Sequence, residues 1–333
     1  MISLNQKKTN ICLCGEWFNG KIYGIFIFFC MWLLIALLGN AMLAAVAIID
    51  KFILSKSVSK PIIFVFYSTI FVLPICLLLP FGINLPSVCT DYLLFGISGF
   101  CFALALWTLY IAIQSSEISH VGPLVGAAMP FFILLLSRVF LGERLGPYGL
   151  LAASILIIGS LIISFDLNEK KPGWHISMSW GVLAGFLFAV SHVIAKYSYD
   201  IYGFYSGFIL TKLPIGIFGA ILFFTPPVRA LFAKKQATSA GKKQSKKLFA
   251  LVVCDIGLGV IGSILLQYAT ALGSVTLVNA LGGAQFAMLI IFVALISKFF
   301  PKILHETFTK KEIIQKTTAV GVISLGLVLL LIK

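Results

Sequence analysis

Charged residues are scarce in this chain of 333 residues, where Asp, Glu, Lys and Arg together make up 11%. Soluble domains carry about 25%. So little charge excludes a soluble enzyme and a disordered chain, because both need a surface that water solvates. The hydrophobic share is 60%, against about 45–50% in soluble domains. The composition therefore predicts a membrane protein.

Cysteine and histidine are also few and scattered, with seven and four residues. The cysteine count is odd, and no Cys-x-x-Cys pair or Cys/His cluster occurs, which excludes a disulfide-rich secreted module and predicts no metal site. His-Glu-x-x-His, Gly-x-Ser-x-Gly and P-loop motifs are absent from the sequence as well. Because each of these motifs supplies a specific chemistry, we expect no enzymatic activity and no cofactor.

Acidic residues are outnumbered, 11 against 25 basic ones, which gives a net charge of +14. The basic residues lie mostly between apolar runs, so we expect anionic membrane lipids as their partner and no nucleic acid. The segment 226–247 contains seven Lys/Arg and no acid. Because short basic loops stay in the cytoplasm, this segment is predicted to be cytoplasmic and both chain termini to lie on the other side.

Long apolar runs are what the sequence has in abundance. A membrane helix needs roughly 20 apolar residues, and the runs are unbroken, whereas the strands of a β-barrel alternate apolar and polar residues. The runs predict ten spans, at residues 28–51, 61–80, 92–114, 120–141, 148–165, 179–197, 203–225, 248–272, 277–299 and 315–332. The predicted fold class is an all-α, polytopic membrane protein.

The two halves of the chain align as weak internal repeats. Placing the first span on the sixth matches Ala44 with Ala189, and placing the fourth on the ninth matches Gly126 with Gly283. Five spans per repeat is an odd number, so the second copy inserts upside down, as in many secondary transporters. The predicted organisation is a tail and interfacial lead-in (1–27), a first five-helix repeat (28–165), a linker (166–178) and a second five-helix repeat (179–333).

The ends of the fourth and ninth spans carry a family resemblance. The fourth ends in Phe-Leu-Gly-Glu-Arg-Leu (140–145) and the ninth in Phe-Phe-Pro-Lys-Ile-Leu-His-Glu (299–306), each followed by a glycine-containing span. This resembles the ten-helix, EamA-type members of the drug/metabolite transporter superfamily, over nearly the whole chain from the first span on. Glu143 and Glu306, at the membrane borders, are expected to have structural roles.

The resemblance implies a secondary transporter in the cell membrane that exports or exchanges a small metabolite by alternating access. It also implies cytoplasmic termini, opposite to the charge count. The small four-helix relatives carry a glutamate within the first span, but here no acid precedes Asp50 in that span, so their proton-for-drug exchange is not expected. The alternative function is a membrane-embedded enzyme or lipid-modifying protein.

Polar groups inside apolar spans are costly, which makes each one a candidate for function. His192 and Lys212 are predicted to bind substrate, Lys212 through an anionic group, and Asp255 to bind a coupling ion or to pair with Lys212. The structural alternative for His192 is a hydrogen bond to a neighbouring helix. Lys196, at a span end, is expected to reach toward the membrane surface. Further substrate-binding candidates, whose alternative is helix–helix hydrogen bonding, are Asn40, Trp107, Tyr110, Tyr268, Asn279 and Gln285.

Overall fold

The computed structural model describes residues 21–54, 61–115, 118–164, 176–233, 242–299 and 310–331, and within them all regular structure is helical. The prediction of an all-helical fold is thus confirmed. Most of the predicted tail (1–27), most of the linker (166–178) and Glu306 lie outside the described residues. The helices are α1 (Lys21–Leu54), α2 (Pro61–Ile70), η1 (Leu73–Phe81), α3 (Cys89–Ser115), α4 (Ile118–Leu136), η2 (Ser137–Leu141), α5 (Pro147–Ser164), α6 (Ile176–Leu222), α7 (Pro226–Ala233), α8 (Lys242–Leu272), α9 (Val275–Ala280), α10 (Gly282–Phe299) and α11 (Lys310–Leu331).

Seven helical segments of the described chain are long and apolar enough to cross a membrane. They are Met31–Ile49, Pro61–Phe81, Cys89–Gln114, Leu124–Leu141, Met178–Leu222, Cys254–Leu272 and Val275–Val293. Two shorter apolar helices, Pro147–Ile163 and Ile314–Leu330, accompany them. The protein is therefore a multi-pass membrane protein.

The longest segment is two helices joined without a loop. Gly203 interrupts α6 with φ 76° and ψ 165°, a conformation that residues with a Cβ rarely adopt. The chain bends there, so residues 176–202 and 203–222 are separate arms. The bend falls between the predicted sixth and seventh spans, 179–197 and 203–225.

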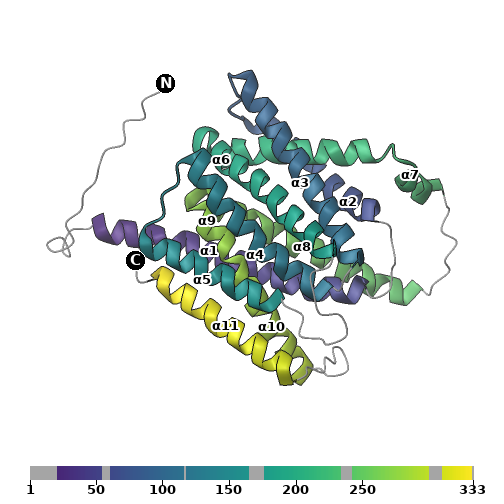
Figure 1. Cartoon of the computed structure of the whole chain (residues 1–333). Coiled ribbons are helices and arrows are strands. Elements are labelled where there is room, and N and C mark those ends of the chain that lie inside the picture. Colours follow the sequence, from purple (N-terminus) through teal and green to yellow (C-terminus); the bar gives the residue numbers. More distant parts are fainter. Residues whose placement is uncertain are drawn as a thin grey trace.

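The helices of the two halves of the chain are interleaved. The start of α1 and the end of α11 lie on the same side of the molecule in Figure 1, and α7 lies on the opposite side. The main packing partners come from different halves: α3 packs on α6, α1 on α8 and α5 on α11. One core cluster accordingly draws on α1, α5, α8, α9, α10 and α11, with Trp32, Leu156, Leu281 and Ile323 among its buried residues.

Small side chains let α6 approach α4 closely. A Cβ at Gly185 would lie 2.8 Å from the Cβ of Ala128 and 3.1 Å from the backbone nitrogen of Met129. One turn further on, Ala189 is fully buried. Such close contact is typical of helices in lipid, because van der Waals packing, and not the hydrophobic effect, drives their association there.

We expect Gly185→Ala to destabilise the protein by about 1–3 kcal/mol, because the added methyl group overpacks the α4–α6 contact. The measurement is the melting temperature of the purified protein in detergent. Gly96→Ala is the matched control, since a Cβ at this helical glycine has nothing within 4 Å and alanine favours helix by up to about 1 kcal/mol. Equal effects of the two substitutions would contradict the close contact.

Candidate functional site

Lys212 lies at the middle of the second arm of α6. It is nine residues after Gly203 and ten before Leu222, which at 1.5 Å per residue places it about 14 Å from either end. Its Nζ lies 4.9 Å from the centroid of the Phe102 ring on α3 and 5.9 Å from that of Phe208. A lysine in mid-membrane is costly, and the two ring faces offset part of this cost through cation–π attraction.

His192, on the first arm of α6, meets the same Phe102 ring. The ring centroids of His192 and Phe102 are 6.5 Å apart, and Phe188 packs edge-on against Phe102 at 5.3 Å. His192 and Lys212, both predicted from the sequence as site residues, therefore converge on one aromatic side chain. We call this group the central cluster, and it consists of Phe102, Phe188, His192, Tyr199, Phe204, Phe208, Lys212, Gln267 and Tyr268.

A directional chain of hydrogen bonds crosses the central cluster. The hydroxyl of Tyr199 donates to Oε1 of Gln267 at 2.9 Å, and Nε2 of Gln267 lies 3.5 Å from Nε2 of His192. Nδ1 of His192 lies 2.8 Å from the carbonyl oxygen of Phe188. Because a carbonyl only accepts, Nδ1 carries the proton, and Nε2 is left to accept from the Gln267 amide. The chain ties the first arm of α6 to α8.

The hydrogen bonds of His192 are those expected if its role is structural, as a packed histidine bonded to a neighbouring helix. Its role in substrate binding stays a prediction. Tyr199, which is 4% exposed, was not among the predicted site residues, because it falls between the predicted spans 179–197 and 203–225.

The other predicted residues lie differently with respect to the cluster. Tyr268 belongs to it, with its ring 5.0 Å from that of Phe204. The amides of Asn40 and Asn279 donate within their own helices, to the carbonyls of Ala36 and Val275, each at 2.8 Å.

The remaining candidates also lie apart from these contacts. The Tyr110 hydroxyl is 2.9 Å from Oγ of Ser68 on α2. The Trp107 side chain is 42% exposed, and Gln285 and Asp255 are partly buried. The ion pair considered for Lys212 and Asp255 is not formed, since among the described residues no carboxylate lies within 4.0 Å of the lysine.

A second polar group gathers where α6 bends. Asp91, in the first turn of α3, is only 6% exposed. Its carboxylate accepts a hydrogen bond from the hydroxyl of Tyr202 and another, at 3.3 Å, from that of Tyr197. Asp91 was not among the predicted site residues, because the predicted third span begins at residue 92. An acid directly before an apolar run was the available signal, since it fits a helix N-terminus.

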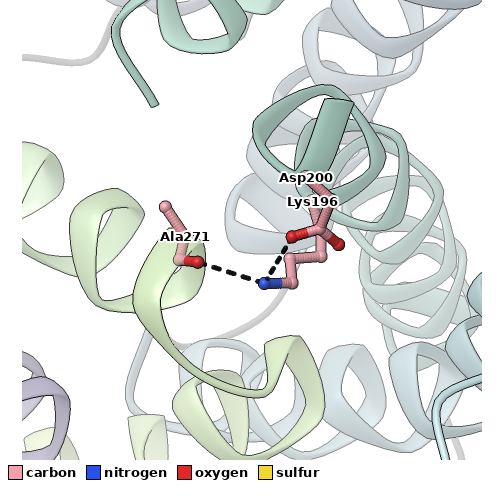
Figure 2. A network of polar contacts seen from close by, with 3 residues as sticks. All are labelled: Lys196, Asp200 and Ala271. Atoms are coloured by element: carbon pink, nitrogen blue, oxygen red, sulfur yellow. Dashed lines mark hydrogen bonds and ion pairs between the residues drawn. The ribbon is translucent and has the colours of Figure 1, made fainter. Parts of the chain in front are cut away.

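Lys196 fastens α6 to the end of α8 near the same bend. Figure 2 shows its ammonium between the carboxylate of Asp200 on its own helix and the carbonyl of Ala271 on the neighbouring one, at 2.9 and 3.2 Å. Lys196 thus ties two helices together, and its expected reach toward the membrane surface stays a prediction.

Glu143 makes a similar tie just after η2. Its Oε2 accepts a hydrogen bond of 2.7 Å from Oγ1 of Thr276 at the start of α9, and Oγ of Ser137 lies 3.0 Å from the same hydroxyl. These contacts agree with the structural role expected for Glu143.

A hollow of about 330 Å³ lies between α1 and α10, lined by Ala45, Ile48, Ile49, Phe292 and Leu295. This lining is entirely apolar, so it offers no group that would orient a metabolite. The described residues contain no group of three or more His, Cys, Asp or Glu able to hold a metal ion.

Comparison with known proteins points to one family. Residues 30–165 match the model of the EamA-like transporter family. A solved structure described as "Crystal structure of protein" has a similar fold, with a TM-score of 0.60 and 15% identity over 90% of this chain and 96% of that one. No curated protein matches the chain. The resemblance seen in the sequence is confirmed over residues 30–165, and this match is consistent with the drug/metabolite transporter superfamily.

Proposed function

We propose that the chain is a secondary transporter in the cell membrane that exports or exchanges a small metabolite by alternating access. The observation that carries the proposal is the meeting of Phe102, from the first half of the chain, with His192 and Lys212, from the second. Inverted-repeat transporters bind substrate near the midplane between their repeats. The contacts of Phe102 with side chains from the other half of the chain support such a position for the central cluster.

The pairing of helices supports ten spans in two inverted repeats, 28–165 and 179–333. The two arms of α6 count as the sixth and seventh spans, α9 with α10 as the ninth, and the shorter α5 and α11 as the fifth and tenth. If the repeats are related by a two-fold axis, each span can be exchanged for the span five places away. The contact of α1 with α8 then becomes the contact of α6 with α3, and the contact of α4 with α6 becomes that of α10 with α1. All four contacts are present, as a two-fold relation between the repeats requires.

The polar ties near Gly203 support a carrier that is closed on the side of the α6 bend. Asp91 holds α3 to α6 through Tyr197 and Tyr202, and Lys196 holds α6 to α8. Substrate release on this side requires these ties to part. Because these hydrogen bonds lie at helix ends, water can take their place once the side opens.

The proposal is tested by loading liposomes containing the purified protein with a cell metabolite extract. We expect one or a few solutes to leave protein-containing vesicles faster than protein-free vesicles, as followed by mass spectrometry. Excess external solute of the same kind should accelerate the efflux, as exchange requires. A new product without movement of any solute would contradict the transporter and favour the membrane-embedded enzyme.

A further inference from the structure

Lys212 has no anionic partner in the described part of the protein. Its ammonium makes cation–π contacts with Phe102 and Phe208, but neither a carboxylate within 4.0 Å nor a hydrogen-bond acceptor among the described residues. Ring faces attract a cation without accepting its three N–H groups as an oxygen would. The lysine therefore keeps donors available in a region where unpaired charge is costly.

The other basic groups around the central cluster are already engaged. Lys196 is paired with Asp200 and donates to the carbonyl of Ala271. Both ring nitrogens of His192 are used in the chain to Phe188 and Gln267, which fixes a neutral imidazole. Lys212 therefore supplies a single positive charge to the site.

Resting on the proposed function, we propose that the substrate carries one negatively charged oxygen group, a carboxylate or a singly charged phosphate ester, which binds Lys212, and an apolar or aromatic body, which lies against Phe102 and Phe208. A singly charged anion neutralises the lysine. A dianion would leave an excess negative charge in the membrane interior, which favours the carboxylate.

The aromatic side chains of the central cluster indicate that the body of the substrate is apolar or aromatic. The Phe204 ring contacts the tilted ring of Phe208 and packs edge-to-face with Tyr268, with centroids 5.4 and 5.0 Å away. Ligand sites lined by aromatic side chains with few polar groups favour an apolar ligand that a polar group orients. A small inorganic anion would leave these ring faces unused.

The binding test uses phenylacetate as the probe, with phenyl phosphate, acetate and the neutral phenylacetamide in parallel, at equal ionic strength set with NaCl. We expect 10 mM phenylacetate to raise the melting temperature of the detergent-purified protein by about 2–4 °C, because a ligand stabilises the state that it binds. Acetate and phenylacetamide should shift it by less than half as much.

Three variants locate the effect. Lys212→Gln should abolish the shift, and Lys212→Arg should keep at least half of it. Arg229→Gln, which removes a charge from an exposed position on α7, should leave it unchanged. Without probe, Lys212→Gln should melt no lower than the wild type, whereas a structural lysine would give a clear drop. The site is overturned if the shift survives in Lys212→Gln, or if neither aromatic anion gives a shift. The preference for a carboxylate is overturned if phenyl phosphate alone gives a Lys212-dependent shift.

The metabolite-loaded liposomes separate this inference from the proposed function. Protein-dependent efflux of carboxylate-bearing solutes, lost in Lys212→Gln, supports both. Efflux of only neutral or cationic solutes overturns the anion site and leaves the transporter. Lys212-dependent probe binding without efflux of any solute leaves the anion site and overturns the transporter.

Discussion

Gln267→Leu is expected to destabilise the protein by about 2–4 kcal/mol. The substitution removes the central member of the hydrogen-bond chain in the central cluster, so that the Tyr199 hydroxyl and Nε2 of His192 lose their partner on α8. Each buried polar group left unsatisfied costs about 1–3 kcal/mol. Leucine has a similar volume and adds no cavity. The measurement is the shift in melting temperature in detergent.

A second substitution identifies the cause of this loss. Tyr199→Phe removes the stranded hydroxyl, so the double variant Gln267→Leu/Tyr199→Phe should lose less than the sum of the two single variants. Gln114→Leu, at an exposed position on α3, is the matched control and should be nearly neutral. Additive losses at positions 199 and 267 would show that the two residues do not interact.

Tyr197→Phe combined with Tyr202→Phe is expected to cost about 3–5 kcal/mol, since hydrogen bonds to charged groups contribute about 1.5–3 kcal/mol each. The double substitution leaves the buried Asp91 carboxylate without its two tyrosine donors. Each single variant should cost about half as much. Thermal unfolding followed by tryptophan fluorescence measures the loss.

Neutralising the acid should reverse the effect. Adding Asp91→Asn to the double tyrosine variant removes the stranded charge and should restore at least half of the lost stability. Tyr148→Phe, at a tyrosine that is 57% exposed, controls for the loss of a hydroxyl in general. A double tyrosine variant as stable as the wild type would show that the Asp91 carboxylate does not depend on these donors.

The helices were predictable because apolar length alone identifies a membrane span. The direction in which each side chain points was not predictable. α3 is apolar on all sides, so its sequence does not show which face packs against other helices. Trp107 illustrates this: it is 42% exposed, while Thr108 beside it is 8% exposed, and its role in substrate binding stays a prediction. A rotation of 100° per residue separates the two environments.

His192 and Lys212 were predictable individually, because polar groups in apolar spans stand out. Their meeting on the Phe102 ring was not, since it depends on how α3 crosses both arms of α6. The structural ties of Asp91 and Tyr199 were missed for the same reason. A hydrogen bond between distant positions leaves no pattern in one sequence.

The loop-free bend at Gly203 has a consequence for how the chain enters the membrane. A single residue joins the two arms of α6, so there is no hydrophilic segment that could be carried across the bilayer separately. The arms must enter as a hairpin, with the polar Lys196, Asp200 and Lys212 carried in together. We therefore expect the two arms to behave as one insertion unit during biogenesis, and either arm expressed alone to insert poorly.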